Sequence, residues 1–273
     1  MSTPRIAFVG AGNMAGSIIG GLLKSGHPAG HISAADPLPA TREHLLEQAP
    51  VTVCADNAEA VATAEVIILA VKPQVMAAAV DSIAAAVRAN GALVISIAAG
   101  ITIASMQARL GPHAAVVRCM PNTPALLGFG ASGLYGNERV TRAQRRTADS
   151  ILGAVGITAW VDSEDALDAV TALSGSGPAY FFLFMEAMID AGVSMGLDRD
   201  TAERLTLQTG LGAAHMAHES GEELAQLRRR VTSPGGTTER AIQRFEKDHL
   251  PRLVGNAMRA AAERAAQMAR EMG

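Results

Sequence analysis

The sequence has few cysteines and few aromatic residues, and each shortage excludes a class of protein. Cys54 and Cys119 are the only cysteines among 273 residues. Two are too few for a disulfide framework, or for a zinc site with the usual three or four ligands. We expect both to be small core residues of a reduced protein without a metal. Aromatic residues make up only 3% of the chain, which favours closely packed helices over a β-sandwich core.

Strong charge and long apolar runs are also missing. The formal net charge is −3 and the sequence pI is about 6.2, so nothing electrostatic favours binding to nucleic acid or an anionic membrane. No apolar run approaches the roughly 18 residues of a membrane helix. The first residues, MSTPRIAFVG, lack the apolar stretch of a signal peptide. We therefore expect a cytoplasmic protein with neither a nucleic-acid nor a membrane partner.

What is present divides into two halves with different patterns. In the first half, short apolar runs alternate with helical patterns, and strands are expected at 5–10, 31–36, 51–54, 65–71, 92–98 and 114–119, with edge strands at 130–135 and 157–161. Near-continuous apolar strands separated by helices predict a mostly parallel sheet covered on both faces. The alternation stops near Asp162. From there, helices are expected at 177–197, 198–219, 222–231, 237–247 and 249–271.

The helix expected at 177–197 is apolar on nearly every side over its first turns. Such a pattern is typical of a helix that is buried all round. Five helices with this much apolar surface seldom bury it within one chain. We therefore expect the second half to form a homodimer with the same half of another copy.

A glycine-rich motif follows the first expected strand. The pattern G-x-G-x-x-A occupies Gly10, Ala11, Gly12, Asn13, Met14 and Ala15. Gly10 permits a tight turn, Gly12 lets a pyrophosphate approach the backbone, and Ala15 lets the following helix (13–25) pack on the strand. The strand before, the helix after and an acid about 20 residues later complete the dinucleotide fingerprint. The alternative is a tight turn without a ligand.

The two halves can now be given a fold class. The chain is predicted to be α/β, with a Rossmann-type dinucleotide-binding domain over 1–162 and an all-α substrate-binding and dimerisation domain over 163–273. The polar stretch DSED (162–165) connects them.

Asp36, at the end of the second expected strand, bears on the choice of cofactor. Its carboxylate can accept from both hydroxyls of an adenine ribose and would repel a 2′-phosphate, which favours NADH over NADPH. Alternatively, Asp36 is a turn residue before Pro37. Arg42 is close enough in sequence to meet a phosphate.

Other candidate cofactor contacts follow the remaining strands, because ligands of an open parallel sheet bind beyond the carboxyl ends of its strands. These candidates are Asn57, Val71, Lys72, Pro73, Ala98, Ala99 and Gly100. Lys72 is one of three lysines, and a solvated surface residue is an equally good interpretation of it. The loop CMPNTP (119–124) is stiffened by two prolines and is expected against the nicotinamide.

No strong base stands where an alcohol dehydrogenase would need one. Neither Tyr135 nor Tyr180 has a lysine four residues later, and the helix expected at 178–196 contains no lysine. Oxidation of an alcohol needs a base for the hydroxyl proton. Reduction of a C=N bond whose nitrogen is already protonated needs less help. The residues therefore favour imine reduction, with a hydroxyacid dehydrogenase and a non-enzymatic dinucleotide sensor as alternatives.

The stretch SPGGTT (233–238) interrupts the helical second half. Gly235 and Gly236 expose backbone N–H groups, while Thr237 and Thr238 begin a helix whose dipole favours an anion at its start. Pro234 stiffens the loop. These features suit a small carboxylate substrate, although a connector with capping threonines would have the same composition.

Six motifs together resemble those of pyrroline-5-carboxylate reductases, the last enzymes of proline biosynthesis: FVGAGNMA, AVKPQ, SIAAGI, RCMPNTPA, SGSGPAY and SPGGTT. The likeness runs from about residue 5 to beyond 260. It implies hydride transfer from NAD(P)H to 1-pyrroline-5-carboxylate, giving L-proline. It also implies a dimer through the helical domain, often assembled further into a ring of dimers.

The resemblance also implies roles for individual residues. It makes Thr238 the catalytic hydroxyl nearest the imine nitrogen. The substrate contacts it implies are Val231, Ser233, Gly235, Gly236, Thr237, Thr238, Ser176 and Asn122. The family usually uses NADPH, but many relatives carry a small polar residue and an arginine where this chain has Asp36 and Pro37. That departure favours NADH or use of both cofactors.

Overall fold

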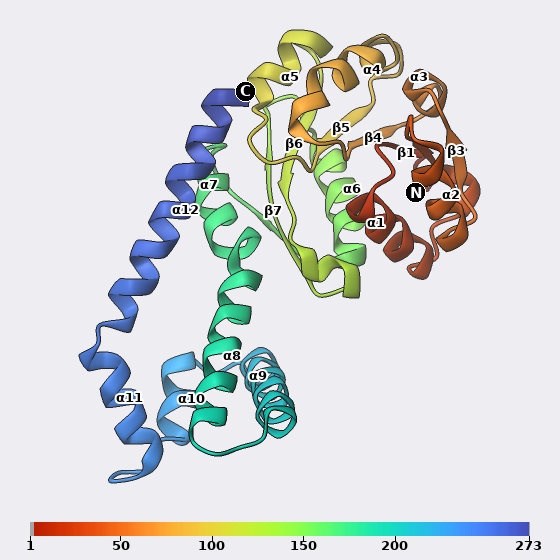
Figure 1. The fold of residues 1–273 in the computed structure, drawn as a ribbon. Helices are drawn as coiled ribbons and strands as arrows, with labels where there is room; N and C mark the ends of the chain where they lie inside the picture. The colour runs from red at the N-terminus through yellow and green to blue at the C-terminus, as the bar shows by residue number, and fades with distance from the viewer. Residues whose placement is uncertain (1–2, 273) are drawn as a thin grey trace. The chain divides into compact units, whose positions relative to one another are not determined.

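The chain forms two compact units in a computed structural model that describes residues 3–272 (Figure 1). The first unit comprises the described residues through Ser176 together with those from Ala260 onward. The second unit spans Gly177–Arg259. The last helical turns of the chain therefore belong with the first unit.

An eight-stranded sheet forms the centre of the first unit. Its strands are β1 Ile6–Val9, β2 Ile32–Ala35, β3 Thr52–Cys54, β4 Val66–Leu69, β5 Leu93–Ser96, β6 Val116–Met120, β7 Gly130–Gly136 and β8 Gly156–Trp160. They lie in the order β3-β2-β1-β4-β5-β6-β7-β8, and only the β6–β7 pair is antiparallel. The predicted Rossmann-type, mostly parallel sheet is confirmed. β1 lies between β2 and β4, so the strand order reverses there, which is where dinucleotides bind in such sheets.

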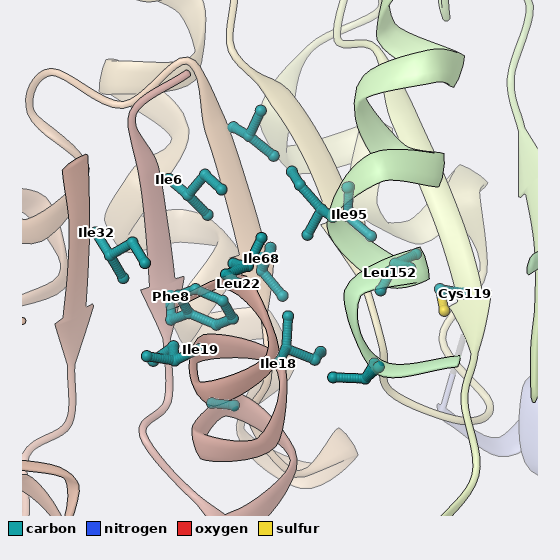
Figure 2. Close-up of a cluster of buried hydrophobic side chains, with 14 of the residues drawn as sticks. Ile6, Phe8, Ile18, Ile19, Leu22, Ile32, Ile68, Ile95, Cys119 and Leu152 are labelled. Atoms are coloured by element: carbon teal, nitrogen blue, oxygen red, sulfur yellow. The ribbon is translucent and has the colours of Figure 1, made fainter. Parts of the chain in front are cut away.

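Helices cover both faces of this sheet. They are α1 Asn13–Lys24, α2 Pro39–Gln48, α3 Asn57–Val61, α4 Met76–Asn90, α5 Ile103–Leu110, α6 Arg142–Leu152 and α7 Ala166–Val170. Successive residues of a strand point to opposite faces. Ile6 and Phe8 accordingly join a cluster with α1 and α6 (Figure 2), while Ala7 and Val9 join another with α4 and α5.

Both cysteines lie in this unit and are buried with free thiols, as predicted. Burial raises the pKa of the Cys119 thiol to about 12, so this thiol stays protonated and inert at neutral pH. None of the helices described has the length and apolarity that crossing a membrane would require.

The five helices predicted for the second half are all present. They are α8 Gly177–Ser194, α9 Arg199–Ser220, α10 Leu224–Arg230, α11 Thr237–Lys247 and α12 Leu250–Met272, the last of which continues into the first unit. Asp198 caps α9 by accepting the Thr201 N–H at 2.9 Å. Neither α7 nor the π-helical turn η5 (Thr171–Gly175) that follows it was predicted from the sequence.

The expectation that the helix at 177–197 is buried all round is wrong within a single chain. Phe181 and Phe182 of α8 are 66% and 61% exposed, and only Gly177, Ile189 and Gly192 of that helix are buried. The physical reason is that α9 is the main neighbour of α8 in the chain, which leaves its other sides open. Leu211 of α9 and Leu253 of α12 are also exposed.

Candidate active site

The predicted cofactor residues meet at one edge of the sheet. Gly10–Ala15 follow β1, Asp36 follows β2, Asn57 begins α3 after β3, Val71–Pro73 follow β4 and Ala98–Gly100 follow β5. These five strands are adjacent and parallel. Their carboxyl ends therefore lie at the same edge, and the structure brings the five segments together there.

The β1–α1 turn has the local geometry that a pyrophosphate requires. Gly10 has φ +95°, and a Cβ atom there would lie 2.7 Å from the carbonyl oxygen of Ala70, so only glycine fits. Gly12 is the N-cap of α1, and no side chain caps the helix. A Cβ on Gly12 would meet no atom within 4 Å, so the space beside it is open. The start of α1 is thus uncapped and the space beside Gly12 is open, so the residues fit a dinucleotide.

The Asp36 carboxylate connects this turn to the end of β2. Its Oδ2 atom accepts the Ala11 N–H at 3.1 Å, and its Oδ1 atom accepts the Leu38 N–H at 3.0 Å. Arg42, in the first turns of α2, donates from Nη1 to the Asp36 carbonyl oxygen at 2.6 Å. The Asp36 residue and the Arg42 guanidinium therefore lie side by side at the place where a Rossmann-type sheet holds the adenine ribose.

The other cofactor candidates differ in how firmly they are held. Asn57 donates from Nδ2 to the Ser82 hydroxyl at 3.0 Å, whereas Lys72 is exposed. Gly100 has φ +74° and lies under the end of α12, where an added Cβ would come within 2.8 Å of Met272 Cε and 3.2 Å of Met268 Cβ. The last turns of α12 therefore pack on the Ala98–Gly100 loop, a contact that was not predicted from the sequence.

A partly buried ion pair near the ends of β5 and β6 was also missed. Arg118 Nη1 lies 2.7 Å from Glu164 Oε1, and the same oxygen accepts the Ile103 N–H at 2.8 Å. Arg118 is only 9% exposed. An arginine inside the apolar run AAVVRC (114–119) was the available signal, because a buried charge needs a partner. The pair joins β6 to the start of α5 and to the segment before α7.

Both the nitrogen and the oxygen of the Asn122 side-chain amide form hydrogen bonds within the chain. Nδ2 donates to the Ser174 carbonyl oxygen at 3.0 Å, and Oδ1 accepts the Ala131 N–H at 2.9 Å. These bonds hold the CMPNTP loop against η5 and the start of β7. Ser176, which closes η5, is half-buried in the same unit.

The predicted substrate loop, 231–238, lies in the second unit and comprises the connection between α10 and α11 together with the first two residues of α11. Gly235 has φ +72° and donates its N–H to Glu239 Oε2 at 2.8 Å, while Gly236 donates its N–H to the Ser233 carbonyl oxygen at 3.0 Å. α11 begins at Thr237 and has no side-chain cap. Two of the predicted donors are thus bonded inside the loop, and the start of α11 remains open.

Two family models match the chain, one in each half. Residues 5–100 match "NADP oxidoreductase coenzyme F420-dependent", and residues 164–268 match "Pyrroline-5-carboxylate reductase dimerisation". The second match takes in α7, η5 and all of α8–α11, and so includes the loop 231–238.

Curated relatives match along the whole length. The pyrroline-5-carboxylate reductase of Pseudomonas aeruginosa is 56% identical over 273 residues, which is 100% of both chains. The chain belongs to the pyrroline-5-carboxylate reductase family. The Pasteurella multocida reductase is 46% identical and is covered over 98% of each chain.

Solved structures of this reductase family share the fold. A pyrroline-5-carboxylate reductase from Coxiella burnetii has a TM-score of 0.95 at 42% identity, covering 98% of this chain and 99% of that one. The Plasmodium falciparum reductase, solved with NADP bound, has a TM-score of 0.85 at 30% identity with the same coverage. Prephenate dehydrogenase from Aquifex aeolicus, at 13% identity and a TM-score of 0.55, is similar in fold alone.

Proposed function

We propose that this chain is an oxidoreductase that reduces 1-pyrroline-5-carboxylate to L-proline with NAD(P)H, in the final step of proline biosynthesis. The observation that carries the proposal is the 56% identity, over the full length of both chains, to a protein named for this reaction. The open β1–α1 turn supports it independently, because that turn fits a dinucleotide.

The cofactor would be held at the carboxyl edge of the sheet. The N–H groups that open α1 are suited to the pyrophosphate, and Asp36 and Arg42 are suited to the adenine ribose. Val71–Pro73 and Ala98–Gly100 follow strands nearer the middle of the sheet and suit the nicotinamide half. When bound, the reduced nicotinamide supplies the hydride.

The proposed substrate contacts are the loop 231–238 in the second unit, and Asn122 and Ser176 in the first. The first N–H groups of α11 suit the carboxylate of the substrate, and the hydrogen bond from the Gly235 N–H to Glu239 ties the loop to the first turn of α11. The Thr238 hydroxyl is assigned to the ring nitrogen, where it donates a hydrogen bond or relays a proton. Catalysis then depends mainly on orientation, since bringing two reacting groups together in a fixed geometry removes much of a barrier.

We propose a role for each half of the chain in the assembled protein. Residues 1–162 would bind the cofactor, and residues 163–273 would bind substrate and form a homodimer, with a ring of dimers as the larger assembly. The exposed phenylalanines of α8 and the match to a dimerisation family model support a second copy as the partner. The free, buried cysteines suit the reducing cytoplasm.

A single assay tests the reaction. Absorbance at 340 nm is followed with pyrroline-5-carboxylate and either NADH or NADPH, and oxidation of at least one of them is expected. Activity with a 2- or 3-hydroxy acid and NAD(P)+ in its place would indicate a hydroxyacid dehydrogenase. Cofactor binding without oxidation by any cyclic imine would indicate a sensor. Either result would overturn the proposal.

A further inference from the structure

Asp36 alone argues against NADPH, because a carboxylate at the end of β2 repels a 2′-phosphate. Its surroundings weaken that argument. Both carboxylate oxygens accept backbone N–H groups, from Ala11 and from Leu38. Hydrogen bonds to a carboxylate stabilise its charge and fix its direction. The charge of Asp36 therefore faces these two amides.

Arg42 lies beside Asp36 with most of its donors unused. Its Nη1 atom donates to the Asp36 carbonyl oxygen at 2.6 Å, and this is the one hydrogen bond of its side chain among the residues described. A guanidinium has five N–H donors. Arg42 forms no ion pair with a carboxylate within residues 3–272, although Glu43 and Glu47 lie on the same helix. The guanidinium of Arg42 is thus not paired with a carboxylate among these residues, and several of its donors are free.

The start of α2 adds a second source of positive potential at the same place. α2 spans ten residues, and its N-cap, Leu38, provides no side-chain cap. Pro37 and Pro39 hold the connection from β2 rigid. Arg42 reaches back over this helix start, so the guanidinium and the positive end of the helix dipole act together. Arginine also matches a phosphate with two parallel hydrogen bonds.

We propose that Arg42 binds the 2′-phosphate of NADPH, so that the chain accepts NADPH despite Asp36. The inference rests on the proposed function, because it assumes that a dinucleotide lies along the β1–α1 turn with its adenine ribose at the end of β2. It assigns the cofactor choice to a residue one turn inside α2. The residue directly after Asp36 is Pro37, whose side chain has no hydrogen-bond donor.

Binding of the oxidised nucleotides tests this without turnover. Dissociation constants of NADP+ and NAD+ are measured by titration calorimetry on the full chain, for the unmodified protein, Arg42→Gln and Arg42→Lys. The ratio of the NADP+ constant to the NAD+ constant should rise about tenfold in Arg42→Gln, as expected for the loss of a charge-assisted phosphate contact. Arg42→Lys, which keeps the charge but not the paired donors, should raise it less.

Arg146→Gln is the matched control. Arg146 is exposed on α6 and forms no ion pair among the residues described, so its loss changes net charge equally and should leave the ratio as it was. A ratio within twofold of the unmodified protein in both Arg42 variants would overturn the inference while leaving the proposed function intact. Failure of the unmodified protein to bind either nucleotide would overturn both. If Arg42→Gln does not fold, Arg42→Lys decides the test by itself. The inference then requires that Arg42→Lys raise the ratio of the NADP+ constant to the NAD+ constant.

Discussion

The two units differ in how far they bury their apolar side chains. Every residue of β1 is buried, because helices cover both faces of the sheet. In the second unit, α8 exposes Phe181, Phe182 and Leu183, each by more than half. A covered parallel sheet closes its own core, whereas these helices leave apolar surface that would gain about 25 cal/mol for each Å² removed from water.

This difference separates a unit that buries its own core from one that leaves apolar side chains uncovered within the chain. The cofactor segments stand on strands whose packing is complete within the chain. The loop 231–238 stands on helices whose packing is incomplete. If a second copy covers α8, as proposed, then assembly also fixes the helices on either side of the proposed substrate loop.

The largest expected effect is on assembly. Phe181→Asp places a charge on the exposed face of α8 and should convert the assembled protein to monomers, as measured by size-exclusion chromatography with light scattering. The matched control is Phe129→Asp, because Phe129 is 81% exposed in the first unit. The comparison fails if Phe129→Asp dissociates the protein and Phe181→Asp does not.

The second-largest expected effect is on stability, because truncation of a phenylalanine should lower the free energy of unfolding more in the first unit than in the second. Phe8→Ala should lower the free energy of unfolding by about 3–5 kcal/mol, because it empties a fully buried site. Phe245→Ala should cost about 1 kcal/mol or less in the single chain, since Phe245 is 42% exposed and meets Phe184 at a centroid distance of 6.2 Å. Urea unfolding monitored by circular dichroism measures both. Equal losses would mean that the second unit is packed as tightly as the first.

The sheet was predictable because its signal is local and repeated. Short apolar runs, each ended by a turn, located all eight strands, and the G-x-G-x-x-A turn marked the carboxyl end of β1, where we propose that the cofactor binds. The burial of α8 was predicted wrongly because hydrophobicity says that a helix will be covered but not by which chain. The contact of Met268 and Met272 with Gly100 was missed because it joins segments more than 160 residues apart, and sequence periodicity carries no such information.

The sequence indicated candidate residues for the site but not the hydrogen bonds that they form within the chain. Gly235 and Gly236 were recognised as donors, but their N–H groups are bonded to Glu239 and Ser233. The Glu239 carboxylate reaches back over one helical turn, which residue type alone did not indicate. Arg118 and Glu164 are 46 positions apart, so only the odd placement of an arginine in an apolar strand hinted at the pair.

The next contrast is between ion pairs of the two units. Glu164→Gln leaves Arg118, 9% exposed, without its carboxylate and should cost about 3 kcal/mol of unfolding free energy. Glu222→Gln, which breaks the pair with Arg230 in the second unit, should cost about 1 kcal/mol or less, because Arg230 is solvated. Chemical denaturation of both variants measures the difference. Similar costs would show that burial does not set the strength of the Arg118 pair.

A smaller effect is expected on catalysis in the second unit. Thr238→Ala should lower kcat about tenfold to a hundredfold through loss of the hydroxyl at the ring nitrogen, while the circular dichroism spectrum stays unchanged. Thr238→Ser keeps a hydroxyl and should recover most of the activity. An unchanged kcat in Thr238→Ala would remove the proposed role.

The smallest expected effect concerns two aspartates whose pKa values shift in opposite directions. Burial raises the pKa of Asp168 in the first unit, whereas hydrogen bonds from Thr201 lower the pKa of Asp198 in the second. Folding therefore becomes less favourable as Asp168 ionises, from about pH 4, the usual value in an unfolded chain, upward. Folding loses the contribution of Asp198 as the pH falls below that value. Asp168→Asn should raise Tm by a few degrees or less at pH 7 and leave it unchanged at pH 3.

Asp198→Ala should do the reverse, lowering Tm at pH 7 with a difference that shrinks in acid, because a protonated carboxyl is a weaker cap. Scanning calorimetry of both variants at pH 3 and pH 7 gives the two signs directly. If Asp168→Asn lowers Tm at pH 7, then the carboxylate gains more from nearby Arg118 than it loses by burial. The ionised Asp168 carboxylate would then stabilise the first unit despite its partial burial.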